Sequence, residues 1–183
     1  MQNWVVIDER YLNYLRAAEP RIPHSDYGTD KMKPFFGVLF EQGELAYVTQ
    51  ISHAQERHKA MRNMPDFIKI YIADRNPALP DRLAAVVNLN YMFPVPKAEM
   101  QEMKYKDIEQ HRTFRSLQEK SRYIDLLSKE LAQINTLDME TKAKKVYHLK
   151  QQFPENFVSR RCLDFERLEA LALAYPAKAD SDS

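Results

Sequence analysis

The stretch Lys33–Arg62, KPFFGVLFEQGELAYVTQISHAQERHKAMR, decides the fold of this chain. Two runs rich in β-branched and aromatic residues flank a turn that contains a glycine, a pattern typical of an antiparallel hairpin. A lysine opens the hairpin and Ser52 ends it, so strand pairing around the turn brings both ends together. His53 and His58 follow at once. The sequence therefore predicts one neighbourhood that contains Lys33, Ser52, His53 and His58.

The residues after the second strand predict a short basic helix. The run 52–55, Ser-His-Ala-Gln, fits a capping box, in which the serine and glutamine side chains satisfy free backbone N–H groups at the helix start. Such a start also offers N–H groups and a positive dipole end to a phosphate. Arg57, Lys59 and Arg62 make this segment positive, so we expect it to attract an anionic partner.

The rest of the chain predicts more strands and then helices. Strands are expected at 4–7, 35–40, 45–52, 67–72, 83–89 and 91–95, and helices at 9–18, 107–134, 139–153 and 165–174. Strands followed by helices indicate an α+β fold. We expect a single domain over residues 1–175 and a small, polar, disordered tail over 176–183.

A second basic cluster accompanies the longest predicted helix. Apolar residues between 108 and 134 recur every three or four positions, the spacing of one buried helix face. Near the start of this helix, Arg112 and Arg115 belong to a group of cations that outnumbers the nearby carboxylates. The sequence therefore predicts a long basic helix in the C-terminal half.

Composition excludes several classes of function. The chain has 183 residues, is 44% hydrophobic and carries a formal net charge of +1, which fits one globular domain without an overall charge bias toward nucleic acid. Cys162 is the only cysteine, so no disulfide framework or zinc ribbon can form, and a cytoplasmic location is expected. Three separated glycines exclude a P-loop and a dinucleotide fingerprint. No signal region or membrane-length apolar run is apparent, so no membrane contact is expected.

The spacing of potential ligands and nucleophiles argues against a metal or a cofactor. His53 and His58 are five residues apart and do not share a helix face as the histidines of HExxH do. No GxSxG elbow surrounds Ser52. Cys162 is expected to be a buried structural thiol. We therefore expect no metal and no cofactor.

The predicted neighbourhood suits RNA cleavage without a metal. RNA supplies its own nucleophile, the ribose 2′-hydroxyl, so a protein needs only to align it, move two protons and stabilise the added negative charge. Lysine stabilises charge, serine orients a phosphate, and histidine transfers protons near neutral pH. Each residue also has an ordinary structural explanation: Ser52 as a helix cap, Lys33 as a surface lysine, and His53 and His58 as exposed helix residues.

The succession of these segments resembles the ToxN/AbiQ endoribonuclease toxins of bacterial type III toxin–antitoxin systems. The resemblance rests on VVIDERYLNYLR, KPFFGVLF, YVTQIS, VVNLNYMFPV and RCLDFERLE, which follow one another along most of the chain. It implies a compact, twisted antiparallel sheet flanked by helices, and an endoribonuclease that leaves 2′,3′-cyclic phosphate and 5′-hydroxyl ends. It also implies cellular or phage RNA as substrate, an antitoxin RNA of pseudoknot repeats that closes with the toxin into a ring, and phage defence by abortive infection.

The resemblance assigns roles by position. Lys33 matches the family's active-site lysine ahead of the Gly-containing strand, and Ser52 matches the serine at the end of the next strand. Tyr27 is the counterpart of a loop tyrosine, two residues out of register with Lys33. The family has a Thr-Ser pair at this point, and this chain has Ile51-Ser52 instead. A lysine often follows the family's serine, and this chain has Ala54 in its place.

Proton transfer then falls to His58 or His53. Phe35 and Tyr27 are expected to stack on bases. The residues expected to contact RNA phosphates are Arg57, Lys59, Arg62, Arg112 and Arg115. Two alternatives stay open: a non-catalytic module that binds structured RNA, and a protein-interaction adaptor that uses the long helix.

Overall fold

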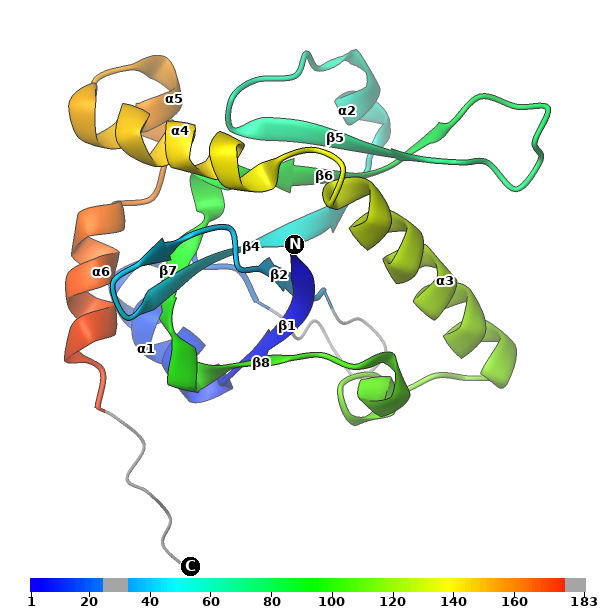
Figure 1. The fold of residues 1–183 in the computed structure, drawn as a ribbon, viewed down its shortest axis with the longest axis horizontal. Helices are drawn as coiled ribbons and strands as arrows, with labels where there is room; N and C mark the ends of the chain where they lie inside the picture. The colour runs from blue at the N-terminus through cyan, green and yellow to red at the C-terminus, as the bar shows by residue number, and fades with distance from the viewer. Residues whose placement is uncertain (25–32, 177–183) are drawn as a thin grey trace, which may run out of the picture.

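The computed structural model describes residues 1–24 and 33–176, so Tyr27 and residues 177–183 of the predicted tail lie outside the described residues. The strands are β1 (Asn3–Ile7), β2 (Phe35–Gly37), β3 (Glu41–Gln42), β4 (Leu45–His53), β5 (Phe67–Ile72), β6 (Arg82–Asn88), β7 (Phe93–Pro96) and β8 (Met100–Glu102). The α-helices are α1 (Glu9–Ala18), α2 (Glu56–Ala60), α3 (Leu117–Ile134), α4 (Met139–Gln152), α5 (Phe157–Arg161) and α6 (Phe165–Ala174). The 3₁₀ helices are η1 (Leu89–Tyr91), η2 (Lys97–Glu99) and η3 (Tyr105–Gln110). This arrangement confirms the predicted α+β class (Figure 1).

The described strands join into one sheet in which each pair is antiparallel. The sheet runs in the order β5-β6-β4-β2-β1-β8, and β3 and β7 also pair with β4. Strand β4 organises the sheet because it pairs with β2, β3, β6 and β7. Residues 45–51 of β4 are all buried, as expected for a strand covered on both faces.

Two glycines allow the hairpin that leads into β4. Gln42 pairs with Leu45, and the turn between them places Gly43 at a φ of 59°, a left-handed conformation that favours glycine. At Gly37 the backbone passes close to β4, since an added Cβ would lie 2.8 Å from Val48 Cγ1. The predicted turn is confirmed.

Strand register divides the sheet into two faces, because directly opposed residues point to the same side and neighbours along a strand alternate. We call one side the Ser52 face; it carries Val5, Phe35, Gln50, Ser52 and Val86. We call the other side the Trp4 face; it carries Trp4, Phe36, Thr49, Ile51 and His53.

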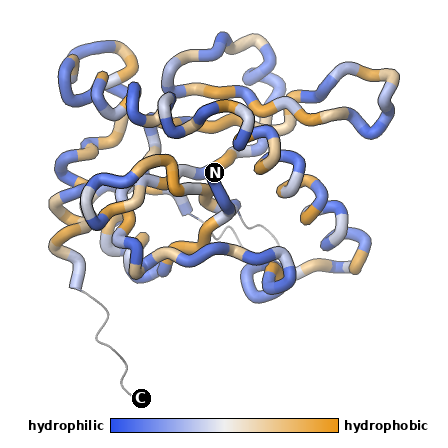
Figure 2. The backbone as a smooth tube through the Cα atoms, in the orientation of Figure 1, coloured by the Kyte–Doolittle hydropathy of each residue, from blue (hydrophilic) through white to orange (hydrophobic). Residues whose placement is uncertain are grey.

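The C-terminal helices pack on the Trp4 face. Trp4 Nε1 donates a hydrogen bond to the carbonyl of Leu127 in α3 at 3.2 Å. The hydroxyls of Tyr47 in β4 and Tyr147 in α4 both donate to one carboxylate oxygen of Glu169 in α6, at 2.7 and 2.8 Å. Burial, followed by this carboxylate, raises the pKa of both tyrosines. Figure 2 shows hydrophobic residues along the central strands beneath these helices.

The opposite face carries the two N-terminal helices. In Figure 1, α1 and α2 lie behind the sheet while α4 crosses in front of it. Helix α2 is held on β5, because Lys69 Nζ donates to the carbonyl of Lys59 at 2.8 Å and the rings of His58 and Phe67 pack at 5.8 Å. Lys69 opposes Val86 and therefore belongs to the Ser52 face.

Two predicted helix starts are wrong. The helix expected from residue 107 begins at Leu117, where the Ser116 hydroxyl caps it by accepting from the Glu119 N–H at 3.1 Å. Residues 105–110 form the separate helix η3. Arg112 and Arg115 therefore precede the long helix, and α3 itself carries three cations and three carboxylates.

The capping box predicted at residues 52–55 is also wrong. Ser52 and His53 continue β4 by pairing with β6, and α2 begins only at Glu56. Its capping box uses Gln55 and His58 instead. Ladder hydrogen bonds to a neighbouring strand outcompete the local cap, because they satisfy the same backbone groups inside a buried sheet. Among the residues that the structure describes, no helix is long and apolar enough to cross a membrane.

Candidate nuclease site

Strand register aligns four residues in a row across the Ser52 face. Ser52 lies opposite Val86 on β6, and Val86 lies opposite Lys69 on β5. On the other side, Phe35 at the start of β2 lies opposite Gln50, and Lys33, two residues before β2, occupies the position that this register, if extended, sets opposite Ser52. Because neighbouring strands lie about 4.8 Å apart, the row from Lys33 to Lys69 spans about 14 Å. A hydroxyl thus stands between two lysine positions on one surface.

A buried glutamine holds the segment before β2 against this row. Gln50 Nε2 donates to the carbonyl of Lys33 at 2.9 Å and to that of His24 at 2.6 Å. Gln50 is only 7% exposed, while Lys33 and Ser52 are half-buried. The structure therefore brings Lys33 and Ser52 to the same end of the hairpin and leaves both within reach of a ligand.

The two histidines near Ser52 occupy different environments. His53 is exposed on the Trp4 face, so it points away from the side of Ser52. His58 is buried, and its Nδ1 accepts a hydrogen bond from the Gln55 N–H at 3.0 Å. Burial, followed by the charges of Arg57 and Lys69, lowers the pKa of His58. The predicted neighbourhood of four residues is therefore wrong for His53, and His58 acts as a neutral helix cap.

Positive charge gathers beside the row. Arg57, Lys59 and Arg62 are all exposed on or just after α2. Lys59 also pairs with Glu56 at 2.8 Å, both side chains being largely exposed. Lys69 adds a half-buried cation beneath the helix. Lys69 was not among the predicted site residues, although a lysine within the apolar strand FIKIYI is a detectable signal.

Arg112 lies in a second positive region, where its side chain makes a cation–π contact and an ion pair. Its guanidinium lies 4.2 Å from the centre of the Tyr123 ring and pairs with Glu119 at 3.3 Å. The Arg115 backbone N–H donates to the same carboxylate at 2.8 Å. Cation–π packing and ion pairing explain a structural role for Arg112.

A pocket of about 260 Å³ has Arg112 in its wall, together with residues of α3 and of the β5–β6 arm. In Figure 1 this arm extends on the same side of the molecule as α3. The cationic residues that line the pocket are Arg75, Arg82, Arg112, Arg122 and Lys129. Its carboxylates are Glu119 and Asp125, which pair with Arg112 and Lys129. Arg75 and Arg82 were not among the predicted site residues, because Arg75 lies in the loop between β5 and β6, Arg82 starts β6, and neither belongs to a recognisable pattern.

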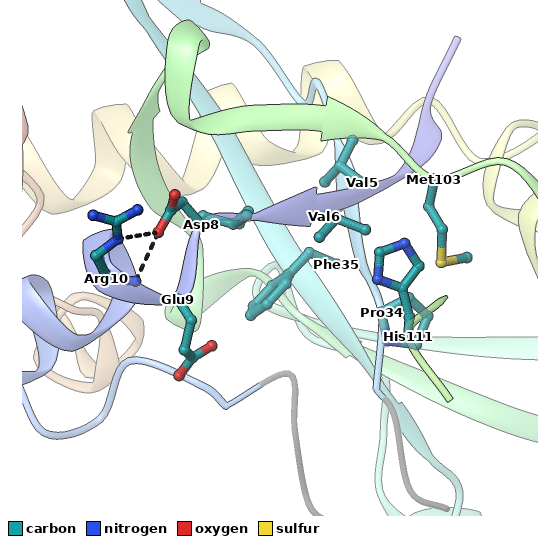
Figure 3. A pocket seen from close by; sticks show the side chains of 10 residues that line it. Val5, Val6, Asp8, Glu9, Arg10, Pro34, Phe35, Met103 and His111 are labelled. Atoms are coloured by element: carbon teal, nitrogen blue, oxygen red, sulfur yellow. Dashed lines mark hydrogen bonds and ion pairs between the residues drawn. The ribbon is translucent and has the colours of Figure 1, made fainter. Parts of the chain in front are cut away.

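A larger pocket, of about 490 Å³, opens beside the row. Its walls are Val5, Val6, Ile7, Asp8, Glu9, Arg10, Pro34, Phe35, Met103 and His111. Figure 3 shows the imidazole of His111 beside Pro34, with the start of α1 at the far end. Phe35 is 1% exposed and packs edge-to-face on Phe93 at 5.6 Å. This ring belongs to the core, so the prediction that it forms an open stacking platform is wrong.

Metal and thiol chemistry find little support in the described residues. Among residues 1–24 and 33–176, no three His, Cys, Asp or Glu side chains gather as metal ligands. Cys162 is 3% exposed, and its Sγ donates to the Val158 carbonyl at 3.4 Å. Burial raises the pKa of the Cys162 thiol to about 11. The prediction of a buried structural thiol is confirmed.

Solved structures of type III toxin–antitoxin components have this fold. One, which describes selective toxin inhibition by a non-coding RNA pseudoknot, is 21% identical, with 95% of this chain and 97% of that chain covered and a TM-score of 0.71. AbiQ, a lactococcal anti-phage endoribonuclease, is 19% identical over 96% and 98% of the two chains, with a TM-score of 0.71. A third, concerning a processed non-coding RNA that regulates a bacterial antiviral system, is 18% identical over 96% and 99%, with a TM-score of 0.73.

The family of the toxin ToxN, from type III toxin–antitoxin systems, matches residues 3–172. The chain therefore belongs to the ToxN toxin family, as its resemblance predicted. No curated protein matches it.

Proposed function

We propose that this toxin is an endoribonuclease that cleaves RNA without a metal ion and leaves 2′,3′-cyclic phosphate and 5′-hydroxyl ends. The observation that carries the proposal is the row on the Ser52 face, in which Ser52 lies between the positions of Lys33 and Lys69. Membership of the ToxN family and likeness to AbiQ, an endoribonuclease, support the same activity.

The three polar residues of the row, Lys33, Ser52 and Lys69, have distinct tasks. The ribose 2′-oxygen attacks phosphorus, and the bond from phosphorus to the 5′-oxygen breaks. The ammonium of Lys33 stabilises the negative charge that grows on the phosphoryl oxygens. The Ser52 hydroxyl donates a hydrogen bond that orients the phosphate. Lys69, with Arg57 on α2, holds the neighbouring phosphates of the strand.

The proposed partners are all RNA. A cognate antitoxin made of RNA pseudoknot repeats would occupy the Ser52 face and close with the toxin into a ring, which keeps substrate out. Cellular or phage RNA is the proposed substrate in the cytoplasm, and phage defence by abortive infection is the proposed role. The pseudoknot inhibition described for one solved relative and the anti-phage role of AbiQ support this regulation.

Cleavage of total bacterial RNA in EDTA tests the activity. We expect 5′-hydroxyl ends that polynucleotide kinase labels without prior phosphatase treatment. Ser52→Ala and Lys33→Met should each slow cleavage by about 10²–10³-fold, the usual loss when one charge-stabilising donor is removed. Ser121→Ala and Lys104→Met are matched controls at exposed positions and should cleave normally. Equal rates for Ser52→Ala and the wild type would contradict catalysis at this site.

A non-catalytic RNA-binding module is the second candidate, favoured by the arginine-rich pocket beside α3. The same assay separates the two functions. RNA that is retained by the protein but remains intact in EDTA would support binding alone.

A further inference from the structure

Of the five histidines in the chain, few lie where the side chain could transfer protons beside the row on the Ser52 face. His53 lies on the Trp4 face, and His58 caps α2 with its Nδ1. His148 sits on α4, next to Tyr147 and on the Trp4 side of the sheet. His24 is held through its carbonyl by Gln50, and it does not line the pocket beside Phe35. His111 does line that pocket.

The pocket that His111 lines lies next to the lysine end of the row. Pro34 lines the pocket and follows Lys33 directly, and Phe35, another lining residue, lies on the same face as Ser52, so the pocket opens next to the row. Figure 3 shows the imidazole of His111 beside Pro34. The volume of about 490 Å³ falls within the range of small-ligand sites and admits a nucleoside next to the scissile phosphate.

The backbone of His111 is fixed while its ring is available. Its N–H donates to the Ile108 carbonyl at 3.1 Å, which anchors it at the end of η3. Within residues 1–24 and 33–176, no hydrogen bond or ion pair engages the half-buried imidazole. By contrast, the ring of His58 already serves as an acceptor.

The charged groups of the same pocket have structural partners. Asp8 caps α1 by accepting from the Arg10 N–H at 2.8 Å, and its carboxylate also lies 3.9 Å from Arg10 Nε. Glu9 pairs with Arg16. These groups lie at the start of α1, at the other end of the pocket from His111 (Figure 3). His111 is thus the side chain of the pocket best suited to transfer protons near neutral pH.

From this geometry we propose that His111 is the general base of the RNA cleavage, a role that rests on the nuclease function proposed above. Neutral imidazole takes the proton of the 2′-hydroxyl as the 2′-oxygen bonds to phosphorus. The bond from phosphorus to the 5′-oxygen breaks, and the leaving oxygen takes a proton from water. The imidazolium then returns its proton to solvent, so the site is restored without any other reactant.

The test measures single-turnover cleavage of a long in vitro transcript between pH 5 and 9 in EDTA. Wild type should show a rate that rises with pH as an imidazole loses its proton. His111→Gln should cleave about 10²–10⁴-fold more slowly, the usual contribution of a general base, and should lose this rise. Added imidazole should restore part of the rate of His111→Ala. His111→Phe, which keeps a packed ring without a basic nitrogen, should be as slow as His111→Gln.

Matched measurements keep the test decisive. His53→Gln, on the opposite face, should cleave like the wild type. Binding of a fully 2′-O-methylated RNA, which lacks the nucleophile, should be unchanged in His111→Gln and so shows that the variant folds. Full cleavage by His111→Gln with an unchanged pH profile would overturn this inference and leave the nuclease function standing. Absence of cleavage by the wild type would overturn both.

Discussion

A buried carboxyl in α3 gives the most quantitative prediction of this structure. Glu130 is 4% exposed, and no hydrogen bond engages its side chain in the described part of the chain. Burial raises its pKa from 4.5 to about 7, against a smaller lowering by the Arg82 guanidinium. Replacing Glu130 with glutamine keeps the shape and removes the ionisable group.

The pH dependence follows from the direction of this shift. The unfolded chain loses the Glu130 proton near pH 4.5, and the folded chain loses it near pH 7. Stability contributed by the neutral carboxyl is therefore complete below about pH 4.5 and is lost as the pH rises to about 7. The loss approaches about 3 kcal/mol above pH 7, since one pKa unit corresponds to about 1.4 kcal/mol.

Urea unfolding at pH 5 and pH 8 measures the effect, on a Ser52→Ala background to suppress the proposed toxicity. Relative to its parent, Glu130→Gln should gain about 2.5 kcal/mol more in unfolding free energy at pH 8 than at pH 5, because a small part of the loss has already occurred at pH 5. Glu140→Gln, at an exposed position on α4, is the control and should show no such pH-dependent gain. The reasoning is refuted if Glu130→Gln changes stability equally at both pH values.

Three further predictions concern packing, thiol reactivity and charge. Gly37→Ala should cost roughly 1–3 kcal/mol of unfolding free energy, because its Cβ would meet buried Val48 at 2.8 Å. Adding Val48→Ala should make that cost smaller, and an undiminished cost in the double variant would contradict the steric explanation. Cys162 should react with Ellman's reagent only on unfolding, because burial raises its pKa to about 11; rapid reaction of the native protein would count against a buried thiol. Arg57→Gln should reduce the salt dependence of RNA binding, measured as the slope of log Kd against log salt concentration, by about one phosphate contact. Lys142→Gln on α4 should leave that slope unchanged. Identical slopes for the two variants would show that Arg57 on α2 does not contact RNA phosphates.

Local signals in the sequence were sufficient to predict structure where a short segment forms its contacts within itself. The left-handed turn at Gly43 needs only a glycine between two strand-forming runs. The helix predicted over residues 9–18 has these bounds, and Asp8 caps it by accepting from an N–H two residues away. The approach of Lys33 to the end of β4 does not follow from the turn alone, because the register shifts by two residues between the pair of Gln42 with Leu45 and the pair of Phe35 with Gln50.

What the sequence alone determined was therefore the α+β class and the turn of the hairpin, both governed by interactions between near neighbours. Only the tertiary structure decided that β4 extends through His53, since its partner β6 lies thirty residues further along the chain. That pairing moved the start of α2 and turned His53 to the Trp4 face. The positions of Lys69 and His111 beside the row were decided in the same way, because strand order and packing join segments that no local pattern relates.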